Sequence, residues 1–243
     1  MYSDVAVIIP SRLGSTRLAR KSLAQIGDKS LISHVVSKLV KLVKNGLYVA
    51  TDSEEIAQEA EKAGATAIMT DEDCPSGSER VFQAFEKIPN HHKINYIINV
   101  QGDMPFVDPN AVNDIIKKLK TTDYDIVTPV VKVTADVAKN PSNVKVVVDL
   151  AGRAMYFSRS LVPYDATEFL YHVGIYGFKR DALEKFVNLE QSEYEKIEKL
   201  EQLRALEHGM KIGICFSSEI PISVDTQEDL NKAREYYSWI SET

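Results

Sequence analysis

The chain has 243 residues, with 29 lysine and arginine residues against 35 aspartate and glutamate residues, which gives a formal net charge of −6. The length suits one domain, and the acidic balance argues against a general nucleic-acid binder. Hydrophobic residues make up 44% of the chain and charged residues 26%, so it can bury a core, which excludes disorder and fibrous repeats.

The first apolar run, Val5–Ile9, is far too short for a signal peptide or a membrane span, which predicts a cytoplasmic protein without membrane insertion. The two cysteines, Cys74 and Cys215, form no close pair, so we expect both to be packing residues. The histidines include no HxxxH or HExxH pair, so the sequence gives no support to a transition-metal site.

Short apolar runs alternate with helical patterns along the first half of the chain. Strands are expected at Val5–Ile9, Tyr48–Ala50, Ala67–Met69 and Tyr96–Val100. Helices are expected at Leu31–Lys44, Glu54–Ala63, Glu79–Ile88 and Ala111–Lys120. This rhythm predicts βαβ units, an α/β fold with a mostly parallel sheet, and a buried central strand at Val5–Ile9.

The rhythm changes after about Tyr124, where strand-like pieces follow one another and predict an antiparallel or mixed extension. These pieces are Ile126–Val133, Val144–Val148, Ala154–Phe157 and Tyr171–Phe178. The last part of the chain predicts a charged helix at Tyr194–Glu207 ended by Gly209, a strand at Lys211–Phe216 and a helix at Gln227–Tyr237 that Thr226 could cap.

A basic loop, residues 10–21, follows the first strand, where open α/β sheets bind ligands. It contains no acid and carries the cations Arg12, Arg17, Arg20 and Lys21. It also offers backbone N–H groups and the hydroxyls of Ser11, Ser15 and Thr16. These groups predict a polyphosphate site, although the loop matches neither GxxxxGK[ST] nor GxGxxG and a solvated basic loop is the alternative.

Two acids follow later strands of the predicted sheet. Asp103 lies in the Gln101–Pro105 turn after the Tyr96–Val100 strand, and Asp225 precedes the last helix. Both would be suited to hold Mg²⁺ beside a polyphosphate, provided that they meet in space. The simpler alternatives are a Gly-Asp turn for Asp103 and helix capping for Asp225.

Read together, these segments resemble the 3-deoxy-manno-octulosonate cytidylyltransferase family, whose members make CMP-Kdo. The resemblance runs almost end to end, through IIPSRLGSTRLARKSL, YVATDSEEIA, DCPSGSERV, NVQGDMPFV, NPSNVKVVVD, AMYFSRSLVPY, HVGIYGF, IEKLEQLRALEHG and PISVDTQEDL. It implies a Rossmann-like nucleotidyltransferase fold of the GT-A type, a homodimer, Mg²⁺ dependence, and the transfer of CMP from CTP to Kdo with release of pyrophosphate, a step of lipopolysaccharide synthesis.

The resemblance also implies one nucleotidyltransferase domain over residues 1–243, with a smaller mixed-sheet extension. Its nucleotide-binding half would span about 1–123, its sugar-binding and dimerisation extension about 124–222, and its C-terminal return 223–243. CTP and Kdo would be the small-molecule partners.

Residue roles are implied by the same resemblance. The nucleotide would be bound by Pro10, Ser11, Arg12, Ser15, Thr16, Arg17, Lys21, Ser76, Gly77 and Arg80. Arg12, Lys21, Asp103 and Asp225 would be catalytic, the two acids as Mg²⁺ ligands. Kdo would be bound by Gln101, Arg159, His172, Tyr176, Glu201 and Gln202. His172 alone would instead suit a satisfied core histidine, and its spacing from Tyr176 predicts one strand face.

The chain departs from the family pattern at two places. Family members commonly read LPGKPL where this chain reads Leu18–Leu23 as LARKSL, and QGDEP where this chain has Met104 beside Asp103. The open alternatives are a cytidylyltransferase for amino-Kdo or a sialic-type acid, and a catalytically silent homologue.

Overall fold

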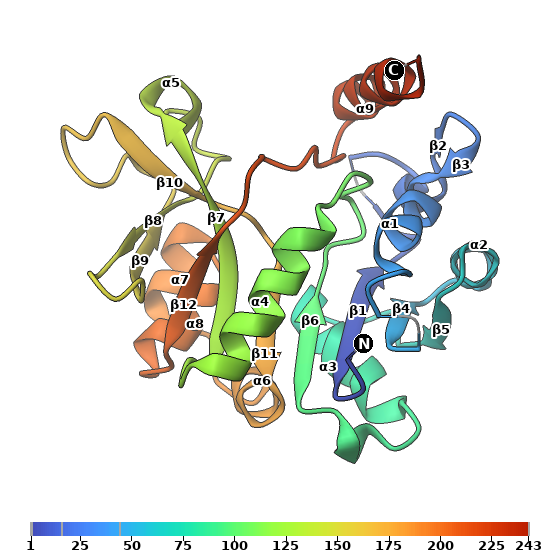
Figure 1. Cartoon of the computed structure of the whole chain (residues 1–243), viewed down its shortest axis with the longest axis horizontal. Coiled ribbons are helices and arrows are strands. Elements are labelled where there is room, and N and C mark those ends of the chain that lie inside the picture. The colour runs from blue at the N-terminus through green and yellow to red at the C-terminus, as the bar shows by residue number, and fades with distance from the viewer. Residues whose placement is uncertain (1, 16, 44, 243) are drawn as a thin grey trace. The chain divides into compact units, whose positions relative to one another are not determined.

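Strand β1 (Val5–Ser11) is the central strand of a parallel sheet in the first of two structural units, residues 1–109 with 221–243 (Figure 1). Six of its seven residues are buried, because both faces of the strand are covered. Strands β4 (Leu47–Thr51) and β6 (Tyr96–Asn99) flank β1, and β5 (Thr66–Met69) pairs with β4. This computed structural model describes residues 2–15, 17–43 and 45–242.

Three helices connect these strands: α1 (Leu31–Leu39), α2 (Glu54–Ala63) and α3 (Gly77–Lys87). The crossovers through α1 and α2 step outward from β1 to β4 and β5, whereas the crossover through α3 returns past β1 to β6. Right-handed crossovers therefore place α3 on the opposite face from α1 and α2. The strand order reverses between β1 and β6, and a ligand crevice forms at the carboxyl ends of strands at such a point.

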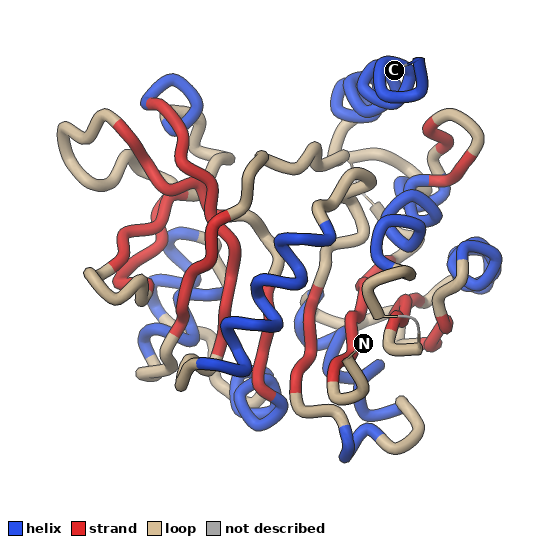
Figure 2. The backbone as a smooth tube through the Cα atoms, viewed as in Figure 1, coloured by secondary structure: helices blue, strands red, loops and turns tan. Residues whose placement is uncertain are grey.

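The C-terminal helix α9 (Gln227–Glu242) packs on the hairpin of β2 (Gln25–Ile26) and β3 (Lys29–Ser30), drawn as two short strands in Figure 2. The Tyr237 ring covers Gly27, where an added Cβ would lie 2.0 Å from the ring. The Tyr237 hydroxyl donates to Asp28 Oδ1 at 2.6 Å, and the ring of buried His34 lies edge-on to Tyr237 with centroids 5.1 Å apart. These contacts fix the hairpin, which follows the basic loop.

The second unit, residues 110–220, is built around β7 (Ile126–Thr134). One edge of β7 pairs antiparallel with β10 (Glu168–His172) and β11 (Tyr176–Lys179), and β12 (Ile212–Phe216) pairs with β7 in parallel. Strands β8 (Lys145–Val148) and β9 (Ala154–Ser158) extend the sheet beyond β10. The mixed extension that the sequence predicts is therefore confirmed.

Helices cover this second sheet and its connections. They are α4 (Pro109–Thr121), α5 (Ala135–Ala138), α6 (Arg180–Val187), α7 (Glu193–Glu198) and α8 (Gln202–Glu207). Gly213 of β12 lies under the Tyr124 ring, which an added Cβ would approach to 2.2 Å. A side chain at this position would displace the ring, so the close packing requires glycine.

Several predicted elements differ from the structure in extent, and the last helix, expected over Gln227–Tyr237, runs on to Glu242. The helix expected to run from Leu31 to Lys44 ends at Leu39, where Leu42 N–H bonds the Leu39 carbonyl and tightens the backbone; Lys44 lies outside the described residues. The helix expected over Tyr194–Glu207 is two helices, because Lys199 takes a left-handed φ of 55° between α7 and α8. Gly209 has the predicted left-handed φ, 74°.

The predicted strand Tyr171–Phe178 is broken between β10 and β11. The Thr128 hydroxyl reaches into the break, 3.1 Å from the Val173 carbonyl oxygen and 2.8 Å from that of Ile175. The single hydroxyl hydrogen can bond only one of these carbonyls at a time, and the Val173 carbonyl also accepts the Ile175 N–H at 2.7 Å.

The α/β class and the mostly parallel first sheet are confirmed, whereas one domain with a three-part division stays a prediction. Within the described residues, no helix is both long and apolar enough to span a bilayer. Cys215 is buried, as expected of a packing residue.

We predict that acidification destabilises the protein partly through His34. Burial, against the opposing hydrogen bond to the Ile26 carbonyl, lowers the pKa of His34 below its usual value of 6.5. The folded state therefore disfavours the charged ring, so stability is complete above about pH 6.5 and falls as the pH drops below it. Urea unfolding from pH 7.5 to 5.5 should show a smaller loss of stability in His34→Gln than in the unsubstituted protein, and equal losses would contradict this role.

Candidate active site

A cavity of about 280 Å³ lies beyond the carboxyl ends of β1 and β6, and all of its lining residues belong to the first unit. Most of the predicted nucleotide and metal residues line it: Pro10, Ser11, Arg12, Ser15, Arg17, Lys21, Ser76, Gly77, Arg80, Gln101, Asp103 and Asp225. Thr16 lies outside the described residues. The place where the strand order reverses thus brings together side chains from four segments of the chain.

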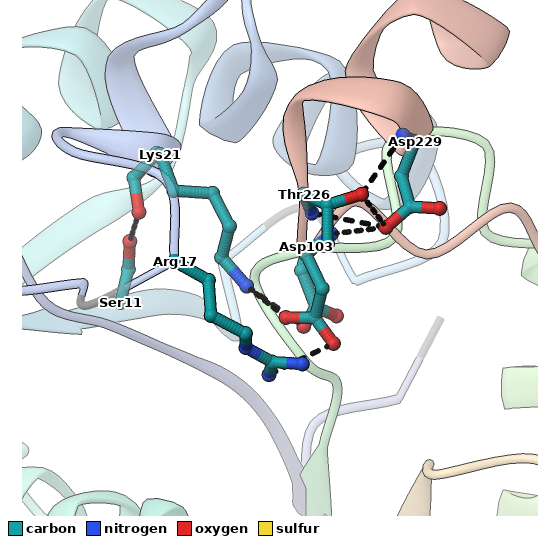
Figure 3. Close-up of polar contacts among 8 residues, drawn as sticks. Ser11, Arg17, Lys21, Asp103, Thr226 and Asp229 are labelled. Carbon is teal, nitrogen blue, oxygen red and sulfur yellow. Dashed lines mark hydrogen bonds and ion pairs between the residues drawn. The ribbon is translucent and has the colours of Figure 1, made fainter. Parts of the chain in front are cut away.

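Lys21 joins the two predicted metal ligands. Its Nζ lies 3.1 Å from Asp103 Oδ2 and 2.9 Å from Asp225 Oδ1, and Figure 3 shows Lys21 and Arg17 reaching toward these carboxylates. Burial alone would lower the pKa of Lys21, but the two carboxylates outweigh it and raise the pKa above its usual value. Asp103 and Asp225 therefore meet in space, the condition for a shared metal.

The second carboxylate oxygen of Asp103 has no partner. Asp103 Oδ1 is buried and makes no hydrogen bond, and burial, opposed by Lys21, raises the pKa of this carboxyl group. Two converging carboxylates with an unsatisfied oxygen fit a hard cation, since Mg²⁺ prefers oxygen ligands and usually takes only one or two from protein carboxylates beside phosphates and water. Among the described residues, no three His, Cys, Asp or Glu side chains gather into a larger ligand set.

Gly102 allows Asp103 to reach this position. An added Cβ at Gly102 would lie 2.8 Å from the Pro10 carbonyl oxygen, at the end of β1. The chain after β6 thus passes directly beside the start of the basic loop, an approach that only glycine permits.

The basic loop is held by several contacts. Leu13 N–H donates to Asp52 Oδ1 at 3.0 Å, and Ser11 Oγ donates to Ser22 Oγ at 2.7 Å. Arg17 pairs with Asp225 Oδ2 at 3.2 Å but is 64% exposed, so this ion pair contributes little stability. Arg20, at a left-handed φ of 54°, pairs with Glu55 of α2 and does not line the cavity.

Ser76 and Arg80 have structural partners at the start of α3. Ser76 caps the helix, accepting the Glu79 N–H at 3.2 Å. The buried Arg80 guanidinium donates to Thr70 Oγ1 at 2.6 Å and pairs with Asp52 Oδ2 at 3.3 Å. Asp52 therefore links α3 to the basic loop, a role that the sequence reasoning missed although an acid directly after a strand was the available signal.

Cys74 also lines the cavity, half-buried, rather than packing in the core as predicted. Its thiol lies 3.5 Å from Gln83 Oε1, and burial raises the pKa of the thiol. A thiol with a raised pKa is a poor nucleophile, so we assign Cys74 no chemistry.

Three of the predicted sugar-binding residues meet within the second unit. The His172 and Tyr176 rings lie 5.3 Å apart across the strand break, and Tyr176 OH donates to Gln202 Oε1 at 3.1 Å. Burial lowers the pKa of His172 to about 3, and burial together with Glu201 raises the pKa of Tyr176. Both rings are therefore neutral, and the buried Gln202 Nε2 has no hydrogen-bond partner.

Arg159 is held by backbone carbonyls. Its guanidinium donates to Glu198 O at 2.8 Å, Pro141 O at 3.1 Å and Lys199 O at 3.3 Å. Lys145 is fully buried beneath it and donates to the Arg159 carbonyl at 2.6 Å, and burial lowers the pKa of Lys145. Lys145 has no signal in the sequence, because an apolar strand gives no sign of a lysine buried within it.

The chain is similar to known cytidylyltransferases. The cytidylyltransferase family model matches residues 6–212. A 3-deoxy-manno-octulosonate cytidylyltransferase of Rickettsia bellii is 55% identical over 97% of both chains, and one of Rickettsia rickettsii is 56% identical over 98% of both. The structure of CMP:2-keto-3-deoxy-manno-octonic acid synthetase complexed with CTP matches with a TM-score of 0.91 at 34% identity, over 98% of this chain and 100% of that chain. The predicted nucleotidyltransferase fold is confirmed.

We predict that Arg20→Gly is more stable than Arg20→Ala. Both variants lose the ion pair with Glu55, but only alanine keeps a Cβ in the left-handed region, so the difference should be about 1 kcal/mol. Urea denaturation of the two variants measures it directly. Equal stabilities would show that the left-handed backbone at residue 20 is not maintained in solution.

Proposed function

The chain belongs to the cytidylyltransferase family, and on that premise we propose that it transfers CMP from CTP to the anomeric 2-hydroxyl of Kdo, giving CMP-Kdo and pyrophosphate. The observation that carries the proposal is the convergence of Lys21, Asp103 and Asp225 in a cavity that the basic loop lines. Cations and carboxylates side by side suit a metal-assisted transfer of a phosphoryl group.

In this mechanism the chain binds and orients the triphosphate. The attacking hydroxyl approaches the α-phosphorus in line, opposite the departing pyrophosphate. Arg12 and Lys21 line the cavity and would bind the β- and γ-phosphate oxygens, where negative charge accumulates as pyrophosphate leaves. Because the carboxylates of Asp103 and Asp225 raise the pKa of Lys21, this amino group is charged at neutral pH.

We propose Mg²⁺ as the cofactor, held by Asp103 and Asp225. The ion would supply charge neutralisation at the phosphate oxygens and lower the pKa of the attacking hydroxyl. The unpartnered Asp103 Oδ1 supports this assignment. No histidine lies among the lining residues of the cavity, so positioning and charge stabilisation would carry most of the catalysis.

The base and the sugar acid would use separate groups. Ser76 and Gly77 line the cavity, where backbone groups can distinguish cytosine, and Arg80 stabilises this region through Asp52. We propose that Gln101, Arg159, His172, Tyr176, Glu201 and Gln202 bind Kdo. Three of the five N–H groups of the Arg159 side chain donate to backbone carbonyls, so two remain to bind the Kdo carboxylate. The unpartnered Gln202 Nε2 can donate to a sugar hydroxyl.

We also propose that the enzyme acts in the cytoplasm, in lipopolysaccharide synthesis, as a homodimer. Large apolar side chains are exposed on the second unit, among them Met155 of β9 at 60% and Ile197 of α7 at 66%. Exposed apolar residues of this kind are suited to a contact between subunits. Light scattering should give a mass near twice 27.2 kDa.

The proposed activity is tested by pyrophosphate release with Mg²⁺ and Kdo, with CTP compared against UTP, ATP and GTP. We expect release with CTP alone, since the cavity would select one base. Amino-Kdo and N-acetylneuraminate in place of Kdo test the alternative sugar acids, and a faster rate with either would reassign the substrate. Silence with every pair, in folded protein, would favour a silent homologue, against which the intact Lys21, Asp103 and Asp225 argue.

We predict that Asp103→Asn lowers turnover more than tenfold, a loss of more than about 1.4 kcal/mol of transition-state stabilisation. The amide keeps the size of the side chain but removes the charge that a metal ion requires. The measurement is kcat at saturating CTP and Mg²⁺, with circular dichroism as a check on folding. A fall of less than tenfold would mean that Asp103 is not a metal ligand.

A further inference from the structure

Main-chain contacts bring Asp225 to Asp103. Val224 N–H donates to the Asp103 carbonyl at 2.9 Å, and the Val224 side chain is fully buried. The two carboxylates therefore leave neighbouring backbone positions on two segments that are more than a hundred residues apart in sequence. This hydrogen bond fixes the chain on the N-terminal side of Asp225.

A capping box fixes the chain on the other side. One carboxylate oxygen of Asp229 accepts the N–H groups of Asp225 at 3.2 Å and Thr226 at 2.9 Å, and the Thr226 hydroxyl at 2.8 Å (Figure 3). In return Asp229 N–H donates to Thr226 Oγ1 at 3.2 Å. Thr226 thus caps α9 as predicted, and Asp229 completes the reciprocal pair.

This arrangement decides what the Asp225 side chain does. Thr226 is the N-cap of α9 and Asp225 is the residue before it, so the helix does not need the Asp225 carboxylate as its cap. Here Asp229 already holds the N–H groups of Asp225 and Thr226. The Asp225 carboxylate instead points to Lys21 and Arg17 in the cavity.

We infer that Asp229 is a positioning residue for the reaction: by accepting the N–H groups at the start of α9, it keeps the Asp225 carboxylate turned into the cavity. Without the Asp229 carboxylate, the N–H groups of Asp225 and Thr226 lose their acceptor, and the backbone at Asp225 loses its connection to α9. The Asp225 carboxylate would then no longer be held beside Lys21 and the proposed metal. The inference rests on the proposed function, because it assigns Asp229 to the same site.

The test is calorimetric binding of CTP without sugar acid, so that no turnover occurs, once with Mg²⁺ and once with EDTA. The unsubstituted protein should bind CTP more tightly with Mg²⁺, since Asp103 and Asp225 then share the ion with the nucleotide. In Asp229→Ala, the ratio of the CTP affinity with Mg²⁺ to that with EDTA should be about tenfold smaller, as expected when a group that orients a metal ligand is lost. Its affinity in EDTA should stay within about twofold, because the triphosphate-binding cations remain.

Two further variants separate positioning from stability. Asp229→Asn keeps an oxygen acceptor and should retain most of the Mg²⁺-dependent gain. Asp181→Ala removes an acid from the first turn of α6, which contributes no lining residue to the cavity, and should leave the gain unchanged. If Asp229→Ala does not fold, Thr226→Val breaks half of the capping box and should reduce the gain in the same direction.

Three results would overturn the inference. One is an Asp229→Ala protein that keeps the full Mg²⁺-dependent gain. Another is equal weakening in Mg²⁺ and in EDTA, which would indicate general disorder of the site. The third is an unsubstituted protein with no Mg²⁺-dependent gain, which would remove the proposed metal and the inference with it. Only this third result counts against the proposed function.

Discussion

The ion pairs of Lys21 with Asp103 and Asp225 are the contacts on which the candidate site depends. Two partly buried carboxylates brought together repel each other and lose hydration, so their closeness requires a cation. Lys21 supplies it from the loop after β1, while Asp103 follows β6 and Asp225 precedes α9. One amino group therefore ties together the three segments that a nucleotide and a metal ion would contact.

Much of the first unit follows from its sequence, because its central strands are continuous apolar runs and its helices show a regular apolar face. Val5–Ile9 is buried on both faces, and no other element suits that pattern. The errors arise where a distant group decides the backbone. The Thr128 hydroxyl interrupts the strand before Tyr176, and the left-handed Lys199 divides a helix that has a continuous charged pattern. The strand break coincides with Gly174, a signal in the sequence that the predicted strand passed over, whereas no glycine or proline lies at Lys199 to mark the division of the helix.

The site could be predicted in part for a related reason. Residues after parallel strands converge whatever their partners are, so the basic loop and Asp103 could be singled out from position alone. Asp225 could not be separated from a helix cap, because the distinction depends on Thr226 capping α9 and on Asp229 accepting the N–H groups of Asp225 and Thr226. The role of Asp52 was not predicted, because it depends on contacts with Leu13 and Arg80, which are distant from Asp52 in sequence.

The departures from the family pattern fit the charge of the site. Met104 is buried, so the residue beside Asp103 adds packing and no charge, and the two carboxylates are balanced by Lys21 and Arg17. The family pattern has two prolines and a glycine in the loop, which this chain lacks. Here the Ser11–Ser22 hydrogen bond and the Arg20–Glu55 ion pair connect the loop to its surroundings. The Ser11–Ser22 bond, between two buried hydroxyls, is the stronger of these, since an exposed ion pair adds little. Order in this loop therefore comes from polar contacts to its surroundings, and a triphosphate that engaged Ser11 would have to compete with Ser22 for its hydroxyl.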